Sequence, residues 1–276
     1  MNINDAERMK NSKQRLRIMA LSISAIIFLI IIAGAVFFQY TPIGYCMSIQ
    51  CRDFTETEHN IYIDNDYAYV TVNENHEFIS KDNAATIINE AKSRVSDFFG
   101  GELQCDPVII ISDNSDIIRK IGDRNAYTFT LHRLFSYIAI SHEYLNVDII
   151  AHEITHAELY CRIMNGRPFQ FVIPVPIWFN EGLASINDYS AKMSEETWKQ
   201  KTDNGTKVRD ITKFTKADFS GKSVNDEMAN AFIVQENYLM CKHEVKAWLD
   251  DNGINALLSL IDGIRDGMDF EALYNE

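Results

Sequence analysis

The amino-acid sequence predicts an α+β domain that follows an N-terminal transmembrane helix. An uncharged run of 21 residues, 18–38, is long enough to cross a bilayer. Short β-favouring segments occupy the first half of the remaining chain, and helical patterns dominate the second half. The net charge of −13 and the lack of a basic patch argue against a nucleic-acid-binding protein.

The uncharged run lies between a basic and an acidic segment. As a helix it would measure about 31 Å, close to the hydrocarbon core of ~30 Å. Five basic residues precede it within ten positions, whereas Arg52 is the only basic residue between Phe38 and Lys81, among seven acidic ones. The positive-inside rule then predicts an outward-facing domain. The predicted parts are a cytoplasmic tail (1–17), a membrane anchor (18–38), a juxtamembrane linker (39–58) and a folded domain (59–276).

A cleaved signal peptide is the alternative for this segment. Small residues at Ala33, Gly34 and Ala35 would suit a signal peptidase. The apolar run is longer than the ~7–15 residues of the usual signal-peptide core, which favours a retained anchor.

The folded domain begins with alternating Ile, Tyr and Val residues that predict a strand or hairpin. An amphipathic pattern ending at Gly100 predicts the first helix, and further β-favouring runs follow it. The expected elements are a strand or hairpin at 60–72, a helix at 82–99, and strands at 107–112, 126–130 and 135–140. A polar stretch after Ala184 leads into three helical runs that are punctuated by Gly253, Gly263 and Gly267.

Residues 152–156 read His-Glu-Ile-Thr-His, an H-E-x-x-H motif. Residues 149–159 contain no Gly or Pro, and Asn146 or Asp148 can cap a helix there. On a helix, His152 and His156 lie four positions apart on one face and can bind one metal ion, while Glu153 reaches a water on that ion. The motif is therefore typical of a zinc hydrolase.

A catalytic zinc ion needs a third protein ligand. The next acidic residue in a helical pattern is Glu181, in the run 178–184, Trp-Phe-Asn-Glu-Gly-Leu-Ala. Pro174 and Pro176 prevent a helix upstream and favour a start close to Ile177, so Glu181 would lie about one turn inside a second helix.

H-E-x-x-H followed by W-F-N-E-G-L-A resembles the gluzincin metallopeptidases, the thermolysin-like clan, and most closely their peptidase-MA-like members. The resemblance covers residues 148–188 and implies a thermolysin-like catalytic domain with one zinc ion held by His152, His156 and Glu181. The 24 residues between His156 and Glu181 exceed the usual spacing and indicate a longer connecting loop at 165–176. A metzincin would need Gly and His where Leu159 and Arg162 stand, which excludes that family.

The resemblance also implies the chemistry of the remaining groups. Glu153 would take a proton from the attacking water and later deliver it to the leaving amine. Tyr238 or His243 would stabilise the oxyanion, and Tyr238 is the residue we select. In this clan a sheet edge beside the metal helix aligns an extended peptide, and we expect residues 135–140 to form that edge.

Other side chains near the motif are expected to support it. Asp148, Ser185 or Asp188 could orient a histidine by accepting its second ring N–H, but the sequence favours a helix cap for Asp148 and a solvated position for Asp188. Cys161 is expected to point into the core, away from the metal. The partners of Cys105 and Cys241 cannot be deduced from the sequence. Cys46 and Cys51 could form a small disulfide outside the membrane.

These observations predict a membrane-anchored, outward-facing zinc endopeptidase with one Zn²⁺ per chain. Its partners would be a protein or peptide substrate and the membrane. Two alternatives remain open: a zinc hydrolase that acts on a non-peptide bond, and a non-catalytic binding module of the cell envelope that keeps the fold. The presence of Glu153 argues against the second, because a binding module needs no base.

Overall fold

The computed structural model describes residues 27–29, 60–63, 67–71, 81–112, 118, 126–132, 135–164, 174–220 and 227–276. The chain divides into two units, Met1–Glu58 and His59–Glu276. The first unit contributes only the short exposed helical segment 27–29 to the described residues. The predicted tail, the linker and the rest of the predicted anchor lie outside them. No helix among the described residues is both long and apolar enough to cross a membrane.

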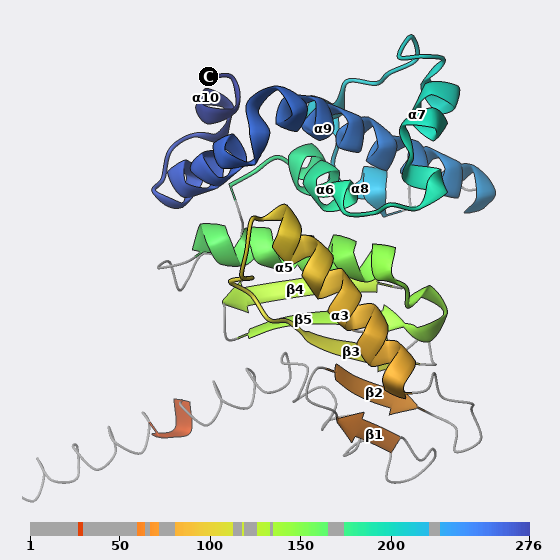
Figure 1. Cartoon of the computed structure of the whole chain (residues 1–276), viewed down its shortest axis with the longest axis vertical. Helices are drawn as coiled ribbons and strands as arrows, with labels where there is room; N and C mark the ends of the chain where they lie inside the picture. Colours follow the sequence, from red (N-terminus) through yellow and green to blue (C-terminus); the bar gives the residue numbers. More distant parts are fainter. Residues whose placement is uncertain are drawn as a thin grey trace, which may run out of the picture. The chain divides into compact units, whose positions relative to one another are not determined.

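The second unit contains a mixed five-stranded sheet (Figure 1). Along the sheet the strands follow the order β1-β2-β3-β5-β4. The three inner strands β2, β3 and β5 run parallel to one another, whereas the edge strands β1 and β4 are antiparallel to the inner strands beside them. The strands are β1 (Asn60–Ile63), β2 (Tyr67–Thr71), β3 (Val108–Ser112), β4 (Ala126–His132) and β5 (Phe135–Ser141). The four predicted β-regions are confirmed, and the first of them contains two antiparallel strands, β1 and β2.

The predicted sheet edge is wrong. Residues 135–140 belong to β5, which pairs with β3 on one side and β4 on the other. Residues 136–141 are buried without interruption, a pattern expected of an interior strand covered on both faces. The edge beside the motif helix is β4, whose sequence of alternating Thr and aromatic residues is only half-buried where its burial is described.

Two of the described helices pack against the sheet, and the described helices after residue 174 form a further layer. In Figure 1, α5 (Val147–Met164) lies between β4 and the C-terminal helices, and α3 (Lys81–Phe98) crosses in front of the strands. The core-facing positions of α3 are spaced as a helix requires and bury Ala84, Ile88, Ala91 and Val95. They share one hydrophobic core with Ile109, Ile111, Ile138 and Ile140 of the sheet and with Ile150 and Ile154 of α5.

The C-terminal layer contains five further α-helices and is built around contacts between α6 and α9. These helices are α6 (Ile177–Ile186), α7 (Glu195–Thr202), α8 (Lys216–Phe219), α9 (Glu227–Arg265) and α10 (Phe270–Tyr274). Short 3₁₀ turns occupy His142–Tyr144, Ala191–Met193 and Ile211–Lys213. Together with the sheet, these helices confirm the α+β class.

The three predicted glycine interruptions are confirmed only in part. Gly253 has φ 80° and kinks α9, and Gly267 has φ 96° in the turn before α10. Gly263, however, lies inside α9. A Cβ atom there would be 2.8 Å from Cδ1 of Leu273, so this glycine serves close packing between α9 and α10 rather than a break.

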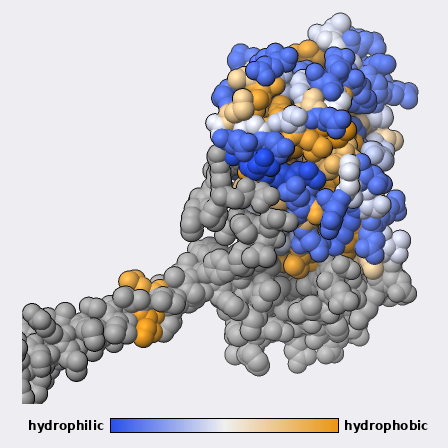
Figure 2. Space-filling view, turned by 60° about the vertical axis from the view of Figure 1, so that its left-hand side comes forward, coloured by the Kyte–Doolittle hydropathy of each residue, from blue (hydrophilic) through white to orange (hydrophobic). Residues whose placement is uncertain are grey.

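Hydrophilic residues are interleaved with smaller hydrophobic areas on the face of the second unit in Figure 2. Large hydrophobic side chains that are exposed come from different elements, and they include Tyr189, Val208, Phe232 and Met268. Scattered side chains of this kind are common on protein surfaces and do not by themselves indicate a partner.

Candidate metal centre

The helix α5 carries the H-E-x-x-H motif and begins where the sequence predicts. The side chain of Asn146 caps it, since its Oδ1 accepts a hydrogen bond from the backbone N–H of Ile149 at 3.0 Å. The helical spacing then brings the rings of His152 and His156 together, with centroids 4.8 Å apart. The second predicted helix, α6, begins at Ile177 directly after Pro176, which puts Glu181 in its second turn.

Three possible ligand atoms converge between these helices. His152 Nε2 lies 3.1 Å from His156 Nε2, and Glu181 Oε2 lies 3.5 Å and 3.3 Å from these two nitrogens, respectively. Among the described residues, these three side chains form the one group of His, Cys, Asp and Glu that could hold a metal ion. Glu181 is almost fully buried, and its Oε2 has no hydrogen-bond partner among the described residues.

The spacing of these atoms fits a tetrahedral zinc ion. Bonds of about 2.0–2.1 Å at tetrahedral angles place neighbouring ligand atoms roughly 3.3–3.4 Å apart. The observed separations of 3.1, 3.3 and 3.5 Å bracket that value. Two imidazole nitrogens and one carboxylate oxygen also form a common ligand set of catalytic zinc, which leaves the fourth position open.

Asn180 sets the orientation of one histidine. His156 Nδ1 lies 2.9 Å from Asn180 Oδ1, a geometry in which the ring donates its Nδ1–H to the amide oxygen. The lone pair of neutral His156 then sits on Nε2 and points towards Glu181 and His152. The lone pair of His156 Nε2 therefore faces the unpartnered Glu181 oxygen, an arrangement that a cation would satisfy.

In the metal-free protein a proton provides this positive charge. Burial alone would lower the pKa of His156, but the carboxylates of Glu181 and Glu153 and the bond to Asn180 raise it to about 9. Burial would raise the pKa of Glu181, but the neighbouring histidines hold it far below its usual range. Without metal, the site is therefore a buried ion pair at neutral pH.

Glu153 lies between the two histidines on α5 and is 9% exposed. Its carboxylate Oε2 and its backbone carbonyl both lie within hydrogen-bond distance of Thr128 Oγ1 in the edge strand β4. The predicted base is thus held where α5 packs against the edge strand β4.

The two predicted oxyanion-stabilising residues occupy different places. The ring of Tyr238 meets the ring of His152 edge-on, with centroids 5.7 Å apart, so Tyr238 lies beside the metal centre. The ring of His243 stacks on Trp198 with centroids 3.5 Å apart, and its Nδ1 is 3.2 Å from Glu195. His243 lines a cavity of about 430 Å³ whose lining contains none of the three metal-ligand candidates.

Gly182 allows Tyr238 to reach the metal centre. A Cβ atom at this position of α6 would lie 2.5 Å from the backbone oxygen of Cys241 and 2.7 Å from a methyl group of Val245 in α9. The two helices therefore approach closely next to Glu181, and the preceding turn of α9 carries Tyr238.

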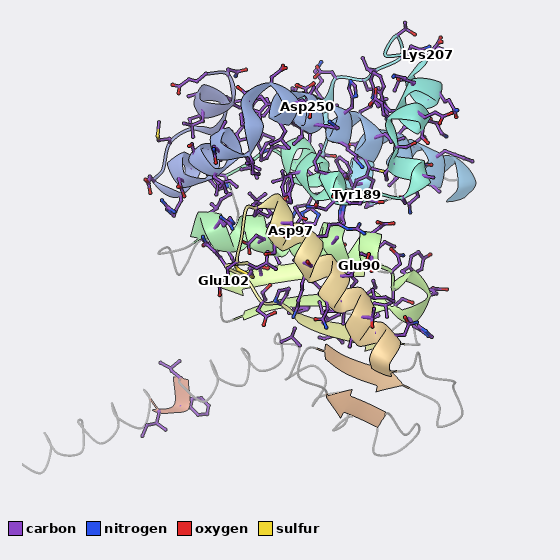
Figure 3. All side chains as sticks on the ribbon, viewed as in Figure 1. Glu90, Asp97, Glu102, Tyr189, Lys207 and Asp250 are labelled. Carbon is purple, nitrogen blue, oxygen red and sulfur yellow. A yellow bond between two sulfur atoms is a disulfide. The ribbon has the colours of Figure 1, made fainter. Side chains whose placement is uncertain are left out.

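The predicted supporting carboxylates have other roles. Asp148 accepts hydrogen bonds from Arg94 of α3 at 2.6 Å and from the backbone of Tyr189 at 3.2 Å. The Arg94 guanidinium also lies over the Tyr189 ring, which Figure 3 labels close to α3. Asp188 accepts from the backbone N–H of Ser190, and Ser185 Oγ has no partner among the described residues. The orientation of His156 by Asn180 is the contact that we did not predict.

The opposite side of α5 is attached to the segment before β3. Cys161 points away from the metal centre, as predicted, and forms a disulfide with Cys105. Glu158 is fully buried, and its carboxylate accepts hydrogen bonds from the backbone N–H groups of Gln104 and Cys105 and from Arg162. Cys241 is buried and free, whereas residues 46 and 51 lie outside the described residues.

Comparison of the chain with models of known protein families finds no match. Comparison with curated proteins also finds none.

Proposed function

We propose that the chain is a zinc-dependent endopeptidase of the gluzincin type. The observation that carries this proposal is the convergence of His152, His156 and Glu181 at separations that suit tetrahedral zinc, with Glu153 beside them on the same helix. Asn180 and the unpartnered oxygen of Glu181 support the same interpretation, because they leave a histidine lone pair and a carboxylate oxygen facing each other with no donor between them.

Zinc, when bound, would acidify a water molecule and polarise the substrate carbonyl. Two side chains of the protein would carry out the other steps of the reaction. Glu153 accepts the proton of the attacking water and returns it to the leaving amine. The Tyr238 hydroxyl donates a hydrogen bond to the oxygen on which negative charge develops, an interaction whose loss commonly costs a factor of ~10²–10³.

The edge strand favours a peptide as the substrate. β4 ends the sheet next to α5, and no described strand pairs with its free side. An extended peptide could pair its main chain with this side and bring a carbonyl group to the metal centre, whatever its side chains. A small non-peptide substrate would make no use of such an edge.

The location that we propose is the outer face of a membrane, with residues 18–38 as the anchor. The basic tail before this run and the acidic segment after it support this orientation. The Cys105–Cys161 disulfide supports it independently, because structural disulfides occur mainly in oxidising compartments.

Replacement of the base is the decisive experiment. Glu153→Gln should keep zinc and the fold but lose hydrolysis of an unstructured protein by several orders of magnitude, because the ligands are intact and the base is gone. His156→Ala and Glu181→Ala should lose most of the zinc, and Ser185→Ala, which changes a buried neighbour without a ligand role, should keep it. Zinc content by atomic absorption and peptide release give the two readouts.

Each alternative has its own outcome. Retention of zinc by both ligand variants would overturn the assigned metal centre. Hydrolysis of esters or amides but not of proteins would favour a zinc hydrolase with a different substrate. Equal envelope phenotypes for wild type and Glu153→Gln would favour the non-catalytic binding module.

A further inference from the structure

Thr128 touches the predicted base at two points. Its Oγ1 lies within hydrogen-bond distance of Glu153 Oε2 and 3.0 Å from the Glu153 carbonyl oxygen. A hydroxyl group has one proton and donates it to one acceptor at a time, and an ionised carboxylate is the stronger acceptor. We propose that Thr128 is a positioning residue, which holds one oxygen of Glu153 so that the other faces the reacting water. This inference rests on the proposed hydrolytic function.

The two carboxylate oxygens of Glu153 have different surroundings. Oε2 is bound to Thr128, whereas Oε1 makes no hydrogen bond to the described residues. A free glutamate side chain can rotate about three bonds, and a base must lie about 2.6–3.2 Å from the proton it takes. Fixing Oε2 therefore reduces the number of positions that Oε1 can occupy. This matters because small displacements of a reacting group strongly lower the reaction rate.

The sheet fixes Thr128 in turn. Thr128 pairs in register with Ile138 of β5, which is fully buried in the hydrophobic core. Thr128 lies on the edge strand along which we propose that the substrate pairs. The base and the bound peptide would then share one rigid support, and the hydroxyl of Thr128 would set the distance between them.

The strand also supplies a matched control. Thr130 is two residues further along β4 and therefore lies on the same face. Its hydroxyl lies 2.7 Å from Ser136 Oγ in β5. Thr130→Val removes the same group from the same strand as Thr128→Val, but it leaves the contacts of Glu153 intact. Thr128→Ser keeps a hydroxyl group and should rescue the function.

The experiment uses the zinc-loaded full chain in detergent. Thr128→Val should lower kcat for an extended peptide by on the order of 10- to 100-fold, the range expected for a lost hydrogen bond to a charged group. KM and zinc content should stay within about twofold of wild type, because Thr128 contacts none of the three ligands. Thr130→Val should keep the wild-type kcat, and Thr128→Ser should recover most of it.

Binding of acetohydroxamate provides a readout without turnover. This chelator binds zinc through two oxygens and gives its hydroxyl proton to the nearest carboxylate, so its affinity reports the position of Glu153. Thr128→Val should weaken its binding by on the order of 10-fold, and Thr130→Val should not.

The outcomes separate this inference from the proposed function. Wild-type kcat and hydroxamate affinity in Thr128→Val would overturn the inference, as would equal losses in Thr130→Val or a parallel loss of zinc. If the wild type hydrolyses no peptide, the proposed function fails, and the hydroxamate affinities of the two valine variants still decide the role of Thr128. If the wild type binds no hydroxamate, both proposals fail.

Discussion

At the scale of single residues, the candidate metal centre is a set of groups whose charge and hydrogen bonds are poorly satisfied without a cation. The buried Glu181 oxygen has no hydrogen bond to a described residue, and Asn180 turns the lone pair of His156 towards it. Buried charges need a partner of opposite sign. In the metal-free protein, a proton on His156 supplies the positive charge. A metal ion and this proton would therefore compete for one site.

This competition predicts proton release on zinc binding. With a pKa of about 9, His156 is protonated at pH 7 and must lose that proton to bind zinc. We expect about one proton to be released at pH 7 and almost none above pH 10, with an affinity that rises up to about pH 9. Calorimetry in buffers of different ionisation enthalpy measures the release. His243→Ala should leave it unchanged, and a binding enthalpy at pH 7 that is independent of the buffer would contradict the prediction.

The same pKa affects the stability of the metal-free protein. The folded value of about 9 lies above the ordinary 6.5, so protonated His156 stabilises the fold. This contribution is fully present below about pH 6.5 and is lost as the pH rises through about 9. Zinc should remove the dependence, because the metal then replaces the proton.

At the scale of elements, the contact between α6 and α9 determines whether Tyr238 lies beside the metal ligands. The contact requires a residue without a side chain at Gly182, since a Cβ atom there would meet the backbone of α9. Helix propensity alone would favour Ala over Gly by about 1 kcal/mol, but overpacking of a core typically costs about 1–3 kcal/mol. The steric effect should therefore dominate.

Gly182→Ala should lower the free energy of unfolding by about 1–2 kcal/mol and also weaken zinc binding, because Glu181 is the adjacent residue. Gly263→Ala is the matched control. A Cβ atom at Gly263 would meet the flexible ends of the Leu273 and Met268 side chains and no backbone atom of another element, so this variant should be close to neutral. Urea denaturation and zinc titration measure the two effects, and equal stability of the two variants would show that the helix contact tolerates a methyl group.

Local signals made the helices of the metal centre predictable. Asn146 and Pro176 lie next to the helices that they start, so the positions of His152, His156 and Glu181 on those helices could be read from the sequence. The order of the strands in the sheet could not be read from the sequence, because strand pairing joins segments that are distant in the chain. The wrong prediction of the sheet edge illustrates this limit, although the apolar run 137–140 was a signal for an interior strand.

Other features of the metal centre depend on tertiary contacts alone. Thr128 is 25 residues from Glu153, and nothing in the local pattern of β4 distinguishes it from Thr130. Cys105 could have paired with any other cysteine, since sequence gives no connectivity. A local signal for Asn180 was present in the sequence, because this residue directly precedes Glu181 on the same helix.

At the scale of the whole molecule, the charge asymmetry around residues 18–38 predicts that the second unit faces outward and stays attached. Protease added to spheroplasts should digest this unit, and a reporter fused after Glu276 should be active only if it works outside the cytoplasm. In the same cells, alkylation without a reductant should leave Cys105 and Cys161 unlabelled. A reporter that works only in the cytoplasm would contradict the orientation, and a soluble form beginning near Val36 would show cleavage of the anchor.

The attachment of α5 on its far side also bears on which ions the protein can hold. Glu158 and the Cys105–Cys161 disulfide tie this helix to the segment before β3, so the two histidine nitrogens are spaced before any ion arrives. A set of ligands held on rigid helices selects ions by their radius. Calcium prefers oxygen ligands at about 2.3–2.6 Å and more of them, so it would have to push the helices apart. A metal site with this 3.1–3.5 Å spacing would therefore disfavour calcium through the stiffness of the fold as well as through ligand chemistry.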